Sequence, residues 1–268
     1  EKNLDSQPIY LLLDMHACPG SQNGDPEISD AASNVASLFD DVYITHNEIT
    51  KQSLTWFIDT WKLISDEYKD HSKIFGYELM NEPVCAREPE TFTVRSDADT
   101  RKQELKKIHQ YAIDIIRRNG DNNIIFINGD FSASEFDMYF SSSSSLLTVP
   151  DDKPDNIAYA FHTYWAAPIV DIPDDFSNRT KLTSRNMTYI RDIYNVPIVN
   201  TEFGENSNVW LGRYLKAMHD ENVGWFSWTN KKWNTTISLH SASLPFAKFV
   251  ENYSSTEINQ LINSLIYA

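Results

Sequence analysis

Residues 74–83 of this chain read IFGYELMNEP, and this segment contains a predicted strand and the polar residues that follow it. Its first seven residues, Ile74–Met80, form an apolar run of the length typical of a buried strand. Similar runs occur elsewhere in the chain, at Ile9–Met15, Asn123–Asn128, Ile157–Phe161, Val196–Thr201 and Val223–Trp228. Because longer segments separate these runs, we expect repeated βα units and an α/β fold with a parallel sheet.

The segments between the runs have helical periodicity. From about residue 48 to 70, apolar side chains recur at three- and four-residue steps, which predicts an amphipathic helix. A second helix is predicted from about 98 to 119, with Gly120 where a helix C-terminal glycine belongs. Weaker patterns predict helices at about 180–194, 207–221 and 255–267, and the region from about 131 to 155 has no clear period.

The overall composition limits the classes of partner. The 268 residues are 41% apolar and contain no evident linker or repeat, so we expect a single domain over residues 1–268. The net charge of −15 would repel nucleic acids and anionic lipid surfaces, which favours an uncharged partner. No apolar run approaches the roughly 18 residues of a membrane span. We expect neither a nucleic-acid partner nor a membrane span, and a monomer is the default.

Side chains that can take part in catalysis or ligand binding follow one predicted strand after another. They are His16, Asn81, Glu82, His162, Tyr164, Glu202 and Trp228. In a parallel βα barrel the carboxyl ends of the strands converge on one face, so these residues would meet in one pocket. A single glutamate or histidine in such a place is more often a helix cap or a structural residue. The whole set favours an active site.

Glu82 and Glu202 suggest a particular chemistry. Two carboxyl groups at one barrel mouth can differ in protonation state, so that one acts as an acid while the other stays ionised. Glycoside cleavage requires this division, because one carboxyl group protonates the leaving oxygen and the other attacks or stabilises the anomeric centre. Zinc-protease, serine-hydrolase and nucleotide-binding motifs are absent from the sequence, so we expect no cofactor and no metal.

The ordered motifs resemble those of glycoside hydrolase family 5, which comprises retaining β-glycanases on the TIM (β/α)8 barrel. The matching segments are LLLDMHACPGSQNG (11–24), GYELMNEP (76–83), FHTYW (161–165), NTEFGE (200–205) and GWFSWTNK (224–231). The segment from His16 to Gly24 looks like the exo-β-glucanase branch, with Cys18 in place of the usual alanine. The resemblance implies hydrolysis of a β-glucan or β-glucoside by double displacement.

The resemblance also implies roles for individual residues. Glu82 matches the acid/base and Glu202 the nucleophile. Asn81 matches the donor to the sugar 2-hydroxyl, while His162 and Tyr164 match a pair that contacts the substrate or nucleophile. His16 and Trp228 match residues that hold the cleaved sugar. Trp233 is either a further sugar contact or an exposed loop aromatic.

The cysteines and sequons suggest an oxidising compartment. Asn178, Asn186, Asn234 and Asn252 each begin an acceptor sequence for N-glycosylation, which predicts a secreted or extracellular protein, or one of a lysosomal or vacuolar lumen. Two cysteines alone are compatible with one disulfide or two thiols. Because Cys18 and Cys85 should follow neighbouring strands, we expect a disulfide between them.

The beginning of the chain departs from the family pattern. If Ile9–Met15 is the third barrel strand, the eight residues before it are too few for two βα units, which occupy on the order of 60 residues. We therefore expect an incomplete (β/α)8-type barrel with strands three to eight, truncated at its N-terminus. The alternative to a glycosidase is a noncatalytic carbohydrate-binding or scaffold barrel that lost turnover with its N-terminal portion.

Overall fold

The computed structural model describes residues 10–26, 28–29, 35–89, 91–140, 147–148, 155–164, 187–204 and 208–228. The chain forms two compact units, Glu1–Ala160 and Phe161–Ala268, and each is considered by itself. The boundary falls within a single strand, β6 (Ile157–Tyr164), so this strand contributes residues to both units.

The first unit contains parallel strands at three of the predicted positions and the beginning of β6. These strands are β1 (Leu11–Asp14), β4 (Ile74–Glu78) and β5 (Ile124–Asn128). Asp14 pairs with Glu78, and Asn128 pairs with Ala160. The polar residues at the ends of β1, β4 and β5 therefore follow adjacent strands at one edge of the sheet.

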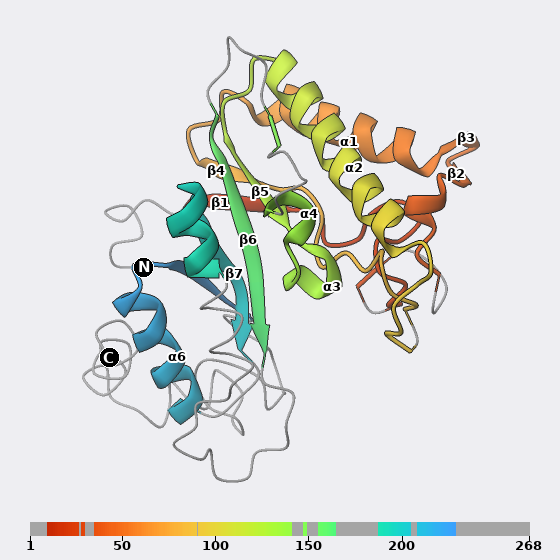
Figure 1. Cartoon of the computed structure of the whole chain (residues 1–268). Helices are drawn as coiled ribbons and strands as arrows, with labels where there is room; N and C mark the ends of the chain where they lie inside the picture. Colours follow the sequence, from red (N-terminus) through yellow and green to blue (C-terminus); the bar gives the residue numbers. More distant parts are fainter. Residues whose placement is uncertain are drawn as a thin grey trace, which may run out of the picture. The chain divides into compact units, whose positions relative to one another are not determined.

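Two long helices, α1 (Ser53–Tyr68) and α2 (Ala98–Arg118), lie side by side next to the strands of the first unit (Figure 1). Helix α2 buries most of its predicted apolar stripe, whereas α1 buries only part of its stripe, with Phe57 and Trp61 fully inaccessible to solvent and Tyr68 exposed. The Trp61 indole N–H donates to the Leu79 carbonyl at 3.1 Å and so ties α1 to the end of β4. Gly120 has a φ of +78°, which confirms its predicted place after α2.

The predicted start of α1 at residue 48 was wrong, because residues 43–52 form a β-hairpin. Its strands, β2 (Tyr43–His46) and β3 (Ile49–Gln52), are antiparallel and follow the 3-10 turn η1 (Ser37–Asp40). Asn47 and Glu48 connect them with φ values of +48° and +66°, as a two-residue hairpin turn requires. The β-branched residues on both sides of Asn47 are the signal that could have identified this hairpin.

The region after β5, which lacks periodicity, contains two short elements, α3 (Asp130–Ala133) and α4 (Asp137–Phe140). Phe131 and Ser132 in α3 have φ values of +50° and +54°, so this element is a left-handed turn. A left-handed non-glycine residue costs roughly 1–2 kcal/mol. Surrounding contacts must offset that cost, which marks the turn as a structurally specified feature.

The second unit contains the end of β6, with β7 (Ile198–Gly204), β8 (Gly224–Trp228) and helix α6 (Asn208–Asp220). Residues 187–194 are also helical, whereas 180–186 and 255–267 lie outside the described residues. Gly204 has to be a glycine, because a Cβ atom there would lie 2.0 Å from the Trp228 carbonyl oxygen.

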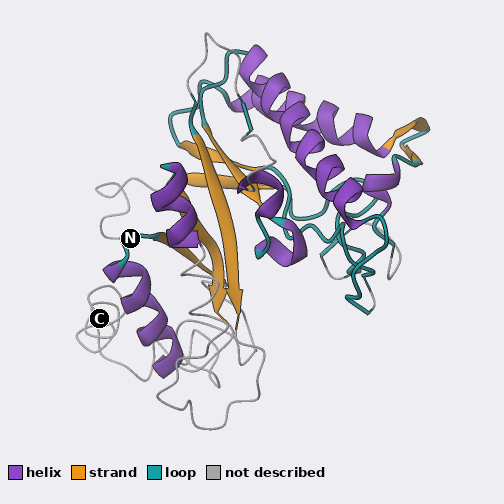
Figure 2. Cartoon of the chain, viewed as in Figure 1, coloured by secondary structure: helices purple, strands orange, loops and turns teal. Residues whose placement is uncertain are grey.

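The six parallel strands follow the order β1-β4-β5-β6-β7-β8, and Figure 2 distinguishes them from the helices by colour. Strands that neighbour one another in chain order, with helical connections, are the pattern of a TIM-type (β/α)8 barrel. The fold is thus α/β with six strands of such a barrel, as predicted. None of the helices in the described part of the chain has the length and apolar character that crossing a membrane requires.

Candidate active site

Glu82 lies just beyond the end of β4 and is held there through its main chain. Its backbone N–H donates to Asn128 Oδ1 at 3.0 Å, and its carbonyl accepts a hydrogen bond from Asn23 Nδ2 at 3.2 Å. Its φ of +46° is in the left-handed region, which a glutamate rarely adopts. The two hydrogen bonds fix this unfavourable conformation, so the position of Glu82 depends on residues of two other segments.

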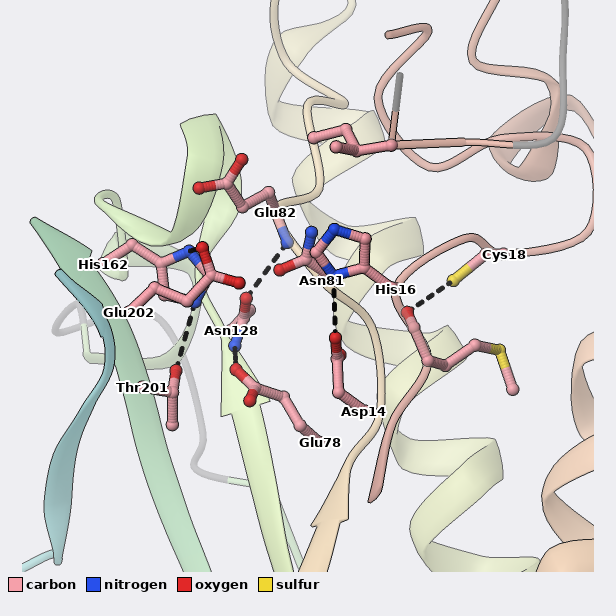
Figure 3. Close-up of polar contacts among 12 residues, drawn as sticks. Asp14, His16, Cys18, Glu78, Asn81, Glu82, Asn128, His162, Thr201 and Glu202 are labelled. Carbon is pink, nitrogen blue, oxygen red and sulfur yellow. Dashed lines mark hydrogen bonds and ion pairs between the residues drawn. The ribbon is translucent and has the colours of Figure 1, made fainter. Parts of the chain in front are cut away.

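Asn128 connects Glu82 to a second, buried carboxyl group (Figure 3). Its Nδ2 donates to Glu78 Oε1 at 2.6 Å, while its Oδ1 accepts from the N–H of Glu82. Asn128 and Glu78 are 0% and 4% exposed, so both side chains lie in the interior. Neither residue was assigned a role from the sequence, although a polar residue at the end of each apolar strand was the available signal.

Gln22, in the SQNG segment after β1, joins the ends of β1 and β4. Its side-chain amide donates to the carbonyls of His16 and Asn81, each at 2.9 Å, and its Oε1 accepts from the N–H of Cys18. The side chain is fully buried, and such amide hydrogen bonds are costly to lose inside a protein. Gln22 therefore ties the loop after β1 to the main chain of Asn81, although the sequence alone gave it no individual role.

His16 and Asn81 are the other predicted site residues of the first unit. His16 Nδ1 lies 2.8 Å from Asp14 Oδ2, so the carboxylate orients the imidazole ring (Figure 3). Asn81 is 1% exposed, and within the described part of the chain its side-chain oxygen and nitrogen have no hydrogen-bond partner. Buried polar atoms are normally satisfied, so an unsatisfied amide beside Glu82 suits a ligand with hydroxyl groups.

The second unit holds Glu202 near the carboxyl end of β7, where three side chains gather. Tyr164 Oη donates to Glu202 Oε2 at 2.8 Å, and His162 Nδ1 lies 3.6 Å from the same oxygen. His162 Nε2 is 3.1 Å from Thr201 Oγ1, which orients the ring (Figure 3). Glu202 is 9% exposed. A buried carboxylate with its rotamer fixed by a phenol suits nucleophilic or electrostatic chemistry.

Trp228 ends β8 in the second unit and is 36% exposed, so part of its ring is open to solvent. Trp233 and the four sequon asparagines, Asn178, Asn186, Asn234 and Asn252, lie outside the described residues. Within each unit, the structure thus brings predicted residues together around one glutamate: His16 and Asn81 lie on neighbouring strand ends with Glu82, and His162 and Tyr164 contact Glu202.

The predicted disulfide between Cys18 and Cys85 is not formed in the structure. Both residues are buried as separate thiols. The Cys18 Sγ atom lies 3.9 Å from the Met15 carbonyl, and the Cys85 N–H donates to Asp130 Oδ1 at 2.7 Å. Burial and the neighbouring Asp130 carboxylate raise the pKa of the Cys85 thiol, which disfavours the reactive thiolate. Position after neighbouring strands was therefore not enough to predict a bridge, because side-chain direction also matters.

The model of the family described as Cellulase (glycosyl hydrolase family 5) matches residues 2–234. A β-xylosidase of Phanerodontia chrysosporium is 26% identical over 156 residues, which are 58% of this chain and 26% of that protein. This chain thus spans about a quarter of that relative.

Solved structures show the same fold at low sequence identity. A triple mutant of an endo-β-1,4-glucanase from Xanthomonas axonopodis pv. citri has a TM-score of 0.59 and 16% identity, and the match covers 97% of this chain and 74% of that one. XacCel5A in complex with cellopentaose has a TM-score of 0.52 and 18% identity, and the match covers 82% of this chain and 63% of that one. A β-glucanase from Saccharophagus degradans has a TM-score of 0.54 and 21% identity, and the match covers 82% of this chain and 58% of that one.

Proposed function

Since this chain belongs to the cellulase family, glycosyl hydrolase family 5, we propose that the protein is a retaining β-glycosidase of β-glucans or β-glucosides. Glu202 attacks the anomeric carbon, and Glu82 gives its proton to the leaving oxygen. A water molecule then gives a proton to Glu82 and attacks the glycosyl ester on Glu202, which restores both carboxyl groups. The product keeps the β configuration.

The contacts of Glu202 are the observation that carries this proposal. Tyr164 Oη donates a hydrogen bond to Glu202 Oε2 at 2.8 Å. This hydrogen bond can adjust as the Glu202 carboxylate loses its negative charge during attack. His162 is 4% exposed, and its Nδ1 lies 3.6 Å from the same Glu202 oxygen. It therefore limits the rotamers that Glu202 can adopt. Preorganised donors of this kind lower the cost of charge movement in the transition state.

The surroundings of Glu82 support its role as the acid/base. The carboxyl group extends from a backbone that hydrogen bonds from Asn23 and to Asn128 hold in place. Asn81 precedes it, and its buried amide has no hydrogen-bond partner among the described residues, which supports contact with a sugar hydroxyl. General acid or base catalysis by a positioned carboxyl group contributes about 10²- to 10⁴-fold to the rate.

The similar proteins support a carbohydrate substrate. Their names include a β-glucanase, an endo-β-1,4-glucanase and a β-xylosidase, and one is bound to cellopentaose. The three enzyme names share the β configuration and include both glucan and xyloside substrates. The four sequons support a secretory location for the proposed enzyme.

The proposal is tested with the full-length protein that carries this chain and with aryl β-glucosides and β-xylosides. Glu202→Ala should abolish turnover, and azide should restore it with formation of the α-glycosyl azide. Glu82→Ala should lose about 10²- to 10⁴-fold on a poor leaving group, and azide should yield the β-glycosyl azide. Glu104→Ala, at an exposed carboxylate of α2 paired with Lys107, is the matched control.

The control should retain full activity. If folded wild type binds glucan but hydrolyses none of several β-linked substrates, the protein is a carbohydrate-binding barrel and the proposal is wrong. Equal residual activity in Glu82→Ala, Glu202→Ala and wild type would also contradict it.

A further inference from the structure

Residues 83–86, directly after the proposed acid, form a buried segment that belongs to no helix or strand. Buried backbone N–H and C=O groups need hydrogen-bond partners, and such a segment must find them outside itself. The Val84 N–H donates to the Gln22 carbonyl at 3.0 Å, and the Ala86 carbonyl accepts from the Arg95 N–H at 3.0 Å. Further contacts to this segment come from the turn after β5.

Asp130, the first residue of α3, accepts hydrogen bonds from two N–H groups of the segment. Its Oδ1 lies 2.7 Å from the Cys85 nitrogen, and its Oδ2 lies 3.2 Å from the Ala86 nitrogen. The Ser132 N–H of the same turn donates to the Pro83 carbonyl at 3.2 Å. The turn after β5 therefore holds the main chain that follows the acid at three residues.

This turn is itself closed by hydrogen bonds. The Asp130 N–H donates to the Glu135 carbonyl at 2.8 Å, and the Glu135 N–H donates back to the Asp130 carbonyl at 2.9 Å. A Cβ atom at Gly129 would lie 2.2 Å from the Glu135 carbonyl oxygen, so only glycine allows this approach. The Glu135 carboxylate is also paired with Arg87 at 2.6 Å and with Lys102 at 3.2 Å. Asp130 thus extends from a turn of fixed shape.

The carboxylate of Asp130 suits two consecutive N–H groups. Asp130 is 0% exposed, and a buried charge is costly unless hydrogen bonds or opposite charges offset its lost hydration. An asparagine has one acceptor oxygen, and its NH2 group would face the second N–H. Two acceptor oxygens for the N–H groups of Cys85 and Ala86 therefore require an aspartate at this position.

We propose that Asp130 is a positioning residue for the acid/base Glu82, which it holds through the main chain of residues 83–86. The inference rests on the proposed function, because it needs Glu82 as the group that gives and takes the proton. Glu82 has a φ of +46°, a conformation that persists only where surrounding contacts support it. Asn128 holds the N–H of Glu82, and Asp130 holds the chain that follows.

The proton transfers make the position of Glu82 important in both steps. Glu82 gives its proton to the glycosidic oxygen while the bond from that oxygen to the anomeric carbon breaks and the bond to the Glu202 carboxylate forms. It then takes a proton from the water that attacks the glycosyl ester. A displacement of 1 Å can cost about 10²-fold in rate. Loss of Asp130 should therefore weaken proton transfer more than attack by Glu202.

The test compares two aryl β-glucosides with the full-length protein that carries this chain. A phenyl leaving group needs protonation, whereas a 2,4-dinitrophenyl group leaves with little help. Asp130→Ala should lower kcat/KM about 10- to 100-fold for the phenyl glucoside and at most about 3-fold for the dinitrophenyl glucoside. Azide needs no general base, so it should raise the kcat of this variant on the dinitrophenyl glucoside and yield the β-glycosyl azide.

Asp121→Asn is the matched control, because it changes a second buried carboxylate at the other end of β5. Asp121 is also 0% exposed, and its oxygens accept from the Tyr77 hydroxyl at 2.8 Å and the Asn123 N–H at 2.9 Å. This variant should have a lower free energy of unfolding, an unchanged ratio of the two kcat/KM values and no response to azide.

Asp130→Asn keeps the size of the side chain and one acceptor, so it should lose less activity on the phenyl glucoside than Asp130→Ala. It decides the same comparison if Asp130→Ala does not fold. Equal losses on both glucosides in the folded variant, or no loss on either, would overturn the positioning role while the proposed function stands. A wild type that hydrolyses neither glucoside would instead contradict the proposed function, and the role of Asp130 with it.

Discussion

Asn128 has two hydrogen bonds with different consequences. Its Oδ1 accepts from the N–H of Glu82, and its Nδ2 donates to the buried Glu78 carboxyl group. The first contact fixes the backbone from which the proposed acid extends, and the second fixes Asn128 itself. Asn128 does not touch the reacting atoms, so it is a positioning residue, and its effect should depend on how much a substrate needs protonation.

This dependence gives a prediction. Asn128→Ala should lower kcat/KM by about 10- to 100-fold on a phenyl β-glucoside, because a misplaced acid protonates poorly. A 2,4-dinitrophenyl β-glucoside needs little protonation and should lose much less. Asn128→Asp, which keeps an acceptor for the Glu82 N–H, should retain more activity on the phenyl glucoside. Asn123→Ala, just before the same strand, is the control, and equal losses on both glucosides in Asn128→Ala would refute the positioning role.

At the scale of elements, helix α2 and the short helix α4 pack around a buried histidine. His109 on α2 is 0% exposed, and its Nδ1 lies 2.7 Å from the Tyr139 hydroxyl on α4. Its Nε2 has no hydrogen-bond partner within the described residues. Burial lowers the pKa of His109 to about 3, compared with about 6.5 in an unfolded chain. The folded protein therefore keeps this ring neutral at acidic pH.

The packing of His109 should make stability depend on pH. Between pH 6.5 and 3 the unfolded chain binds a proton at this position and the folded chain does not, so acidification favours unfolding. The maximum slope is about 1.4 kcal/mol of unfolding free energy per pH unit. His109→Gln cannot titrate, so its unfolding free energy should fall less steeply than that of wild type from pH 6 to pH 4.

Urea unfolding followed by tryptophan fluorescence at pH 4, 5 and 6 measures these slopes. His219→Gln, at an exposed histidine in the last turn of α6, is the control and should keep the wild-type slope. An unchanged slope in His109→Gln would show that the burial of His109 between α2 and α4 does not cause the predicted pH dependence of the unfolding free energy.

At the scale of the whole molecule, the strands were predicted well from the sequence, because buried strands can be recognised as runs of apolar residues. Strands β4 and β5 begin within one residue of their predicted starts, since a mostly buried parallel strand is a continuous apolar run. The site residues at the strand ends follow from the same topology. The places of Glu82 just after β4 and of Glu202 near the end of β7 were predictable, because the parallel sheet dictates where strand ends lie.

Other features depend on contacts between distant segments and leave no such trace. Asn128 acts through the main chain of Glu82, 46 residues earlier in the chain. The left-handed turn of α3 is set by tertiary contacts, since Phe131 and Ser132 have no local preference for it. The thiols of Cys18 and Cys85 show that proximity of loops does not determine a disulfide. Hydrogen bonds and side-chain directions decided these cases.

Glu202 is the proposed nucleophile, and trapping the covalent intermediate tests this role directly. The full-length protein is incubated with 2,4-dinitrophenyl 2-deoxy-2-fluoro-β-glucoside, which slows hydrolysis of the glycosyl enzyme. Peptide mass spectrometry should find one fluoroglucosyl group, carried by Glu202, and the Glu202→Ala variant should carry none. A label on another residue, or inverted product with no label while the wild type still turns over the substrate, would contradict the account.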